Sequence, residues 1–292
     1  MAQSTTTAQN LALMHRYITS IQQNGNLTLI DSVFHKDFFD HTAAPSGSGQ
    51  GREYVRAIIR HLHSALQDIQ IEVIHCICES DVVATTKVLR GKQVGELFGN
   101  QPKMTEGWIE FMVMDFMTVV DGKLREHWAT IGEFESIQHM PELPPPSSSR
   151  TATGASTTTA AGGENVALMR RYIMEVQQGG DLTLIDSLFH QDFLDHTAHP
   201  GVVPGCKDVH AVLGHLHAAV ADIRFEIIHC ICQDNVVATT KVLRGKQVGE
   251  LFGRPVAESG SGRIEIMTMD FVRVVEGMFR ERWACVGDVR DV

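Results

Sequence analysis

Long hydrophobic runs and an excess of basic charge are both missing from this chain of 292 residues. No stretch of about 18 consecutive apolar residues occurs, so a membrane-spanning helix is not expected. The chain opens Met1-Ala-Gln-Ser-Thr-Thr-Thr, without the basic and apolar segments of a secretory signal, and a cytoplasmic protein is therefore expected. Lys and Arg number 25 against 35 Asp and Glu, a net charge of −10. That acidity disfavours nucleic acid as a partner, because phosphate backbones are bound mainly by cations.

The six cysteines do not predict a disulfide framework, because thiols stay reduced in the cytosol. Cys76 and Cys78 follow His75 in a segment that resembles a strand. Alternation along a strand places the two thiols on one face and the imidazole on the other, so no third metal ligand is evident. We therefore expect neither a metal nor a cofactor.

The decisive feature is an internal repeat. Residues 82–99 and 236–253 both read VVATTKVLRGKQVGELFG, and LTLIDSVFHKDFFDHTA from Leu27 matches LTLIDSLFHQDFLDHTA from Leu182. A period of about 155 residues is too long for a solenoid and indicates a duplicated domain. We predict domains over residues 9–139 and 164–292. The intervening residues 140–163, rich in Pro, Ser, Thr and Gly, are predicted to form a flexible linker.

Each copy predicts helices first and strands afterwards. The spacing of apolar residues predicts helices around residues 11–21, 27–34 and 55–66 in the first copy. Residues 69–78, 82–94, 109–119 and 124–131 read as strands, and Asp121-Gly122 is a strong hairpin turn. This order predicts an α+β domain with helices on one face of a bent antiparallel sheet.

Three motifs then carry a resemblance to a known family. They are a helix ending in NGNL with a later DHT before a Gly-rich loop, LRGxxxGExxG in the long strand, and DFxxVx(D/E)GxxxExW near the end. Together they resemble the SnoaL-like polyketide cyclases of the nuclear transport factor 2-like superfamily. The resemblance implies two tandem cone-shaped domains, each a curved sheet with a deep apolar pocket. It also implies that the domains pair as an intramolecular pseudo-dimer, with further homo-oligomerisation left open.

Mapped residue by residue, the resemblance implies a site in each copy. The implied polar residues are Asp40, His41, Asp115 and His127 in the first copy, and Asp195, His196, Asp270 and Arg282 in the second. The substrate-binding residues are predicted to include Val113 and Trp128 in the first copy and Thr268 and Trp283 in the second.

Asp115, His127, Asp270 and Arg282 are the predicted catalytic residues. Asp115 and Asp270 lie in apolar strands, where burial is expected to raise the pKa of a carboxyl and make it an acid or a base. His127 and Arg282 would polarise an oxygen, but Arg cannot serve as a base near neutral pH, so the two sites are not expected to work identically.

Three observations leave the chemistry open. Ala129 and Ala284 stand where the family's aldol cyclases carry their catalytic Asp, so that mechanism is not expected here. The Asp40-His41-Thr42 motif could equally be a local cap. Lys87 and Lys241 could reach the pocket or extend to solvent, and alternation does not decide between these.

The sequence thus predicts a cofactor-independent cyclase or isomerase that acts by acid–base catalysis on a hydrophobic polyketide- or terpenoid-like intermediate in secondary metabolite biosynthesis. One alternative is a non-catalytic protein of the same fold that binds small molecules or serves as a scaffold. Another is an enzyme of the epoxide hydrolase or dehydratase type. Fold alone does not decide among them.

Overall fold

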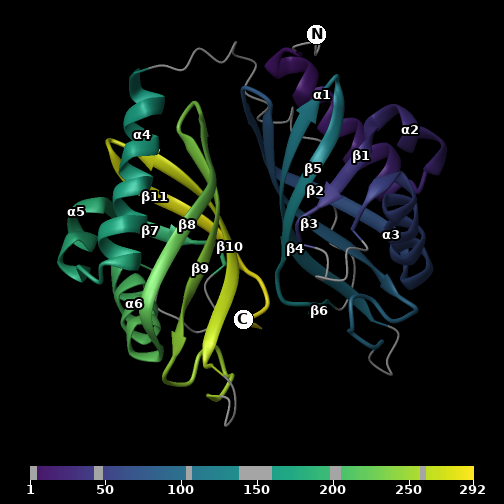
Figure 1. Ribbon diagram of the computed structural model, residues 1–292. Helices are drawn as coiled ribbons and strands as arrows, with labels where there is room; N and C mark the ends of the chain where they lie inside the picture. The colour runs from purple at the N-terminus through teal and green to yellow at the C-terminus, as the bar shows by residue number, and fades with distance from the viewer. Residues whose placement is uncertain (1–4, 43–48, 103–106, 138–159, 198–204, 257–260) are drawn as a thin grey trace. The chain divides into compact units, whose positions relative to one another are not determined.

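The chain divides into two compact units, Met1–Ser156 and Thr157–Val292. The computed structural model describes residues 5–42, 49–102, 107–137, 160–197, 205–256 and 261–292. Most of the predicted linker, residues 140–159, lies outside these ranges. Its last part, residues 160–163, differs from the prediction because it forms the start of helix α4, Ala160–Arg171 (Figure 1).

The two units contain the same elements in the same order. The first unit comprises α1 Thr7–Arg16, η1 Tyr17–Gln23, η2 Leu27–Leu29, α2 Ile30–Val33, β1 Phe34–Asp40, α3 Gly51–Ala65, β2 Leu66–Glu79, β3 Val82–Gln93, β4 Trp108–Val120, β5 Lys123–Ile131 and β6 Glu135–Ile137. The second comprises α4, η3 Tyr172–Gln178, η4 Leu182–Leu184, α5 Ile185–Leu188, β7 Phe189–Asp195, α6 Cys206–Ala219, β8 Val220–Gln233, β9 Val236–Gln247, β10 Arg263–Val275, β11 Met278–Val286 and β12 Arg290–Asp291.

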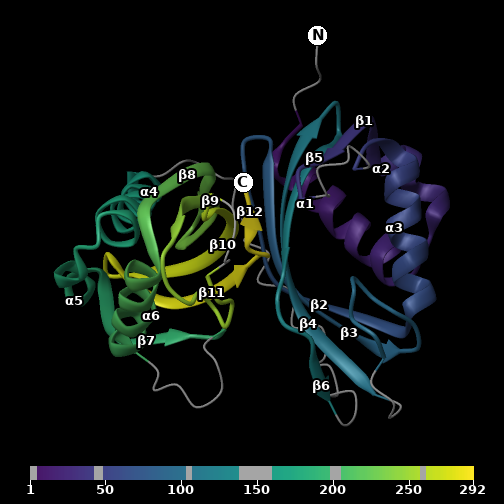
Figure 2. The ribbon, with the colours of Figure 1, turned by 60° about the horizontal axis from the view of Figure 1, so that its bottom comes forward.

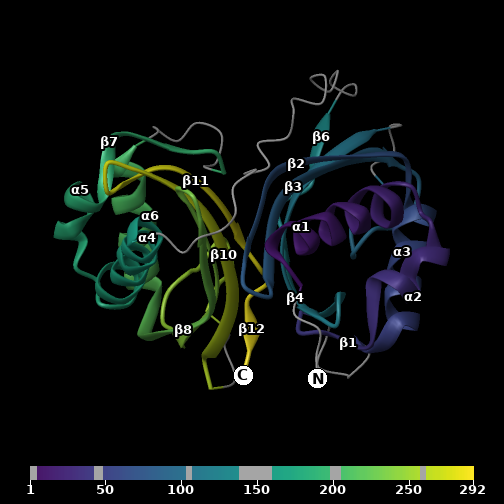
Figure 3. The same cartoon turned by 90° about the horizontal axis from the view of Figure 1, so that it is seen from above.

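Each unit is built on one curved sheet. The strand order is β1-β5-β4-β3-β2 in the first unit and β7-β11-β10-β9-β8 in the second, with β6 pairing β4 and β12 pairing β10. All pairings are antiparallel except β1 with β5 and β7 with β11. Figures 2 and 3 show each sheet curving around the helices of its own unit, which confirms the predicted α+β architecture.

The predicted helix faces form the core. The apolar positions of the first helix, Leu11, Met14, Ile18 and Ile21, are all buried. Thr6 caps α1 reciprocally with Gln9, which satisfies the first free amides of the helix. Burial of such a stripe against a sheet contributes most of the stability of a short helix.

Two local features differ from the sequence prediction. Phe34, predicted at the end of a helix, begins strand β1, which pairs in parallel with the last long strand β5. The first helix does not stay α-helical but widens into a π-helix over Tyr17–Gln23, and η3 repeats this in the second unit. Such π-turns are rare and occur often at functional sites.

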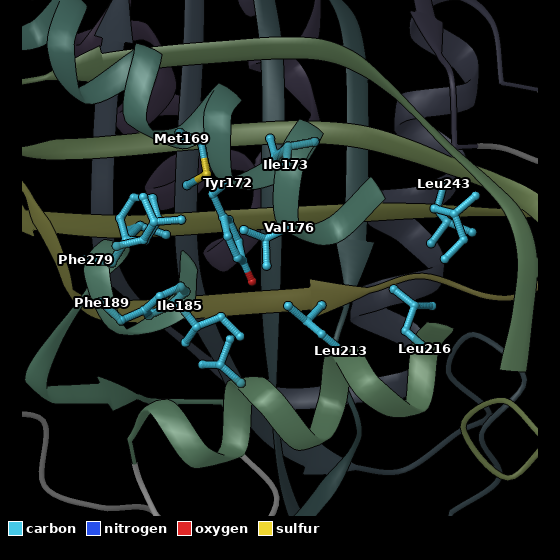
Figure 4. Close-up of a cluster of buried hydrophobic side chains, with 14 of the residues drawn as sticks. Met169, Tyr172, Ile173, Val176, Ile185, Phe189, Leu213, Leu216, Leu243 and Phe279 are labelled. Carbon is cyan, nitrogen blue, oxygen red and sulfur yellow. The ribbon is translucent and has the colours of Figure 1, made fainter. Parts of the chain in front are cut away.

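The core of the second unit surrounds a buried tyrosine. Figure 4 shows Tyr172 reaching from its helix among Val176, Ile185 and Phe189. Its ring makes an edge contact with Phe189, with centroids 5.2 Å apart, and another with Phe279 at 5.5 Å. Because Tyr172 is only 3% exposed, its hydroxyl lies inside the unit rather than in solvent.

Neither unit contains a helix, within the ranges that the structure describes, that is long and apolar enough to cross a membrane.

Two glycines of the second unit should respond oppositely to alanine. A Cβ on Gly245 of β9 would clash with Val220 Cγ1 and lie 2.8 Å from the backbone oxygen of Ala221, whereas a Cβ on Gly214 of α6 would meet nothing within 4 Å. We expect Gly245→Ala to destabilise the unit by about 1–3 kcal/mol through overpacking. Gly214→Ala should stabilise it by about 0.5–1 kcal/mol, because glycine loses more entropy in a helix. Urea unfolding measures both, and equal effects would contradict the close approach of β8 and β9.

Candidate functional site

Four buried charged side chains meet on the helix-facing side of the first sheet. Strand register brings them together, since Asp115 lies opposite Thr85 on β3, and Asp40 of β1 lies opposite His127 of β5. Lys87 follows Thr85 by two positions and therefore projects from the same face. We call Asp40, Lys87, Asp115 and His127 the first charge cluster.

Short contacts join these four groups into a chain. Lys87 Nζ lies 2.6 Å from Asp115 Oδ2, which also accepts a hydrogen bond from Thr85 Oγ1 at 2.9 Å. His127 bridges both carboxylates, with Nε2 at 3.1 Å from Asp115 Oδ1 and Nδ1 at 3.1 Å from Asp40 Oδ2. The side chains of Lys87 and Asp115 are 0% and 2% exposed, whereas those of His127 and Asp40 are 12% and 10% exposed. His127 and Asp40 are therefore the outer members of the cluster.

The ionisation of Asp115 is opposite to the sequence expectation. Burial does act to raise the pKa of Asp115, but the charge of Lys87 and the hydrogen bond and charge of His127 outweigh it. The pKa of Asp115 is therefore held below its ordinary range. The expectation that burial would leave this carboxyl with a raised pKa was wrong, because the sequence alone does not place Lys87 beside it.

His127 is the group whose titration is moved toward basic pH. Burial acts to lower the pKa of His127, but the charge of Asp40 and the hydrogen bond with Asp115 raise it to about 9. For Asp40, burial acts to raise the pKa, but the charge of His127 and the hydrogen bonds of His127 and Thr42 lower it below its usual range. At neutral pH the cluster holds two anions and two cations.

Two residues of the π-helix η1 contact Lys87, the most deeply buried member of the cluster. Lys87 Nζ donates to Gln22 Oε1 at 2.7 Å, and the same Nζ lies 5.6 Å from the centre of the Tyr17 ring. Burial and the charges of Asp115 and Asp40 raise the pKa of Tyr17, whereas Gln22, five positions along the helix, acts to lower it. A π-helix brings residues five apart into register, which places Tyr17 and Gln22 on the same side of the helix.

The second unit repeats the cluster with one exchanged cation. We call Asp195, Lys241, Asp270 and Arg282 the second charge cluster. Lys241 Nζ contacts Asp270 Oδ2, and Arg282 donates from Nε to Asp270 Oδ1 at 2.9 Å and from Nη1 to Asp195 Oδ2 at 2.9 Å. Burial acts to raise the pKa of Asp270, but the charges of Lys241 and Arg282 lower it to about 2. Here too the buried charges balance.

The two units differ in the contacts of the glutamine on the π-helix. Gln177 stands where the first unit has Gln22, and it acts to lower the pKa of Tyr172 against the stronger effect of burial. Its Oε1 is buried and has no partner among the described residues, whereas Gln22 Oε1 accepts from Lys87. The second unit therefore keeps the Lys–Asp pair without the glutamine that anchors the lysine in the first.

Several predicted site residues do not join the clusters. His41 stacks on Trp128 with centroids 4.2 Å apart, and its Nε2 lies 3.4 Å from Glu126. Trp128 follows His127 directly and therefore points to the other face of the sheet. His196 and Trp283 repeat this stack at 4.2 Å.

Val113 and Thr268 lie on the cluster faces, opposite Lys87 and Lys241 in the strand register. Val113 packs in an apolar cluster that includes Leu62 and Leu66. These positions are compatible with the predicted binding role, which stays a prediction.

The cysteines are free, and the part of the chain that the structure describes holds no group of three or more His, Cys, Asp or Glu suited to a metal ion. Burial raises the pKa of the Cys76 thiol to about 12, so this cysteine is not poised as a nucleophile at neutral pH.

The sequence does not predict the lysine partners of the carboxylates. The contacts of Lys87 and Lys241 depend on which residues of β4 and β10 lie opposite them, and this register is not evident from the sequence. A lysine in an otherwise apolar strand, aligned with an aspartate in the neighbouring strand, was the available signal. Gln22 and Gln177 carried no signal, since their placement depends on a π-helix that the pattern does not predict.

Substitution of one member of the buried Lys87–Asp115 pair should lower the free energy of unfolding more than substitution of a surface lysine. Lys87→Met leaves Asp115 without its closest cation, and we expect a loss of about 3 kcal/mol or more in the free energy of unfolding. Lys36→Met is the control, since the Lys36 side chain is 75% exposed and its pairing with Asp37 is worth little. A double-mutant cycle with Asp115→Asn should show strong coupling, and additive effects would contradict a direct pair.

The protonated state of His127 predicts a pH dependence of stability. The pKa of His127 rises from 6.5 to about 9 on folding, so protonation stabilises the fold. That stability is complete below pH 6.5 and is lost as the pH rises through 9, by up to about 3 kcal/mol. His127→Arg copies the second unit and should remove this dependence, because Arg stays charged. Thermal unfolding between pH 6 and pH 10 measures the difference, and parallel curves for the two proteins would exclude a buried imidazolium.

Comparison with known proteins gives one family and several structures. A model of the SnoaL-like polyketide cyclases matches residues 12–139 and 167–290. A search of curated proteins finds no match. TsrD from Streptomyces laurentii is similar at 20% identity over 42% of this chain and 88% of its own, with a TM-score of 0.38. A SnoaL-like polyketide cyclase from Agrobacterium tumefaciens is similar at 14% identity, over 42% of this chain and 91% of its own, with a TM-score of 0.37.

The family model covers nearly all of both units, and the observed topology is the same in each. The repeat first seen as identical residues is therefore a repeat of one family domain, and the chain belongs to the SnoaL-like polyketide cyclase family.

Proposed function

We propose that the protein is a cofactor-independent cyclase or isomerase that moves protons on a hydrophobic polyketide- or terpenoid-like intermediate in secondary metabolite biosynthesis. The observation that carries the proposal is the imidazole of His127, held between two carboxylates and kept protonated at neutral pH. Family membership supports a cyclase-type reaction. The acid–base chemistry comes from this chain's own residues.

In the first unit, His127 acts as the acid. Its raised pKa means that it is charged near neutral pH, and it can hydrogen-bond to or protonate a substrate carbonyl as negative charge develops on the oxygen. Asp40 accepts the proton from the neighbouring carbon, because it is the more exposed carboxylate of the two. Asp40 then returns a proton to His127 across their 3.1 Å contact, so the protein ends each cycle unchanged.

Asp115 and Lys87 have a positioning role in this scheme. The Asp115 side chain is only 2% exposed, against 10% for Asp40, and it lies behind His127, Lys87 and Thr85, so a substrate carbon has less access to it. It instead keeps the imidazole charged and oriented. This replaces the catalytic role predicted for Asp115 from the sequence.

The second unit acts differently. Arg282 can stabilise a negatively charged oxygen but does not release its proton near neutral pH. Asp270 is occupied by Lys241 and Arg282, as Asp115 is by its partners. We infer that the second unit binds and polarises a ligand, and that proton transfer belongs to the first unit.

The tandem repeat of one family domain supports a further proposal, that the two units pair as an intramolecular pseudo-dimer.

One observation favours the alternative of non-catalytic binding. All four charged groups of each cluster have partners inside the protein, as structural ion pairs do. Buried ion pairs also perturb pKa values without any catalytic role. A measurement of proton exchange separates the two functions.

Enolisation of a hydrophobic ketone tests the proposal. We expect the protein to accelerate exchange of the C2 proton of 2-methyl-1-tetralone in D₂O, followed by NMR. His127→Gln and Asp40→Asn should each lower this acceleration about 100-fold or more. His35→Gln, an equivalent change on β1 at a residue whose imidazole pairs with Asp37, is the control. Exchange that is no faster than in buffer would favour the non-catalytic alternative, and exchange that survives His127→Gln would refute the role of His127.

A further inference from the structure

Helices α3 and α6 occupy equivalent positions in their units, which allows a comparison residue by residue. Val55 and Val209 are each 5% exposed, and Leu62 and Leu216 are buried in the same order along the two helices. In this register Tyr54 of the first unit corresponds to Asp208 of the second. The exchange removes an aromatic ring and its hydroxyl group.

In the first unit that hydroxyl is part of the site. Tyr54 Oη donates to Asp40 Oδ2 at 3.2 Å, beside His127 Nδ1 on the same oxygen. Thr42 occupies the other oxygen, Oδ1, with its backbone N–H at 2.9 Å and its hydroxyl at 2.5 Å. Burial and the charge of Asp40 raise the pKa of Tyr54 above its ordinary value, so the phenol stays neutral and remains a donor.

In the second unit the corresponding carboxylate has one donor fewer. Thr197 donates to Asp195 Oδ1 from its backbone at 2.9 Å and its hydroxyl at 2.7 Å, as Thr42 does to Asp40. Arg282 Nη1 donates to Oδ2 at 2.9 Å, in place of His127. Within the ranges described, no group occupies the position on Oδ2 that Tyr54 takes in the first unit. The Asp195 side chain is only 8% exposed, so bulk water has little access to that oxygen.

Asp208 cannot fill this position itself. Its side chain is shorter than tyrosine by the length of a phenyl ring, and its carboxylate would repel Asp195. The pKa of Asp208 is raised by burial and by the negative charge of Asp195, against the opposing charge of Arg282.

We propose that the second unit contains a binding position for a ligand phenol, in which the ligand hydroxyl donates to Asp195 Oδ2 and its ring takes the place that Tyr54 fills in the first unit. Tyr54 is thus an internal model of the ligand. The first unit carries the phenol within its own chain, and the second unit has Asp208 at the corresponding position.

The charges select a neutral hydroxyl group. Asp195 and Asp208 both disfavour a phenolate, and an ether lacks the proton that Asp195 Oδ2 accepts. Hydroxylated aromatic rings satisfy both conditions. This inference rests on the proposed function only in that the second unit binds a small molecule, and it requires no turnover.

Binding of p-cresol, which is the tyrosine side chain itself, tests the proposal on the full chain. Ligand-observed NMR at neutral pH should show that p-cresol binds at least tenfold more tightly than 4-methylanisole, since a hydrogen bond to a buried charged acceptor is lost with the ether. Asp208→Tyr should lower the affinity for p-cresol tenfold or more by filling the position from within. Equal affinities for the two ligands, or an affinity that Asp208→Tyr leaves unchanged, would overturn the proposal.

The first unit supplies a second, independent test. Tyr54→Asp should create the same position beside Asp40 and raise the number of p-cresol molecules bound from one to two. Tyr54→Phe is the matched control, because it retains the ring and should leave the number at one. A crystal structure of the p-cresol complex should place the ring beside Asp195, and a ring bound elsewhere would refute the assignment. If the unmodified protein accelerates ketone exchange but does not bind p-cresol, this inference fails while the proposed function stands.

Discussion

The buried pair of lysine and aspartate at the centre of each sheet is the interaction on which the rest of the site depends. Lys87 is fully buried and Asp115 nearly so, and neither could remain charged there alone. Desolvation of two ions costs several kcal/mol each, and the pair recovers this only with good geometry and further hydrogen bonds. Thr85, on strand β3, donates to Asp115, and Gln22, on the π-helix, accepts from Lys87, so both elements stabilise the same pair.

Charge balance then constrains what can be exchanged beside the pair. The outer cation may be His127 or Arg282, because each bridges the same two carboxylates and keeps the cluster neutral. A neutral residue at this position would leave an unpaired buried carboxylate, at a cost of several kcal/mol. The exchange of His for Arg therefore preserves the fold while it changes whether the site can release a proton. Electrostatic stability and chemical reactivity are separable at this one position.

Much of the fold could be predicted from the sequence, and less of the site. The repeat, the α+β order, the buried helix stripe and the hairpin at Asp121-Gly122 depend on local spacing, and the structure and the family match confirm the architecture. The grouping of Asp40, Asp115 and His127 was also expected. Their ionisation was not, because it depends on Lys87 of the neighbouring strand β3. Side-chain alternation gives a residue's face only after the register between strands is known.

Duplication explains why the second cluster could diverge. Thr85, Lys87 and their counterparts Thr239 and Lys241 lie in the segment that is identical in the two units, so the strand that holds the inner pair has been left unchanged. The exchanges fall on the outer side, at Tyr54 and Asp208 on the helices and at His127 and Arg282 on the last long strand. Each of these pairs contacts or faces the outer carboxylate, Asp40 or Asp195. A substitution at these positions changes the proton donor, or the side chain next to the outer carboxylate, without disturbing the buried ion pair. A chain with two such sites can therefore keep one for proton transfer while the other changes toward ligand binding.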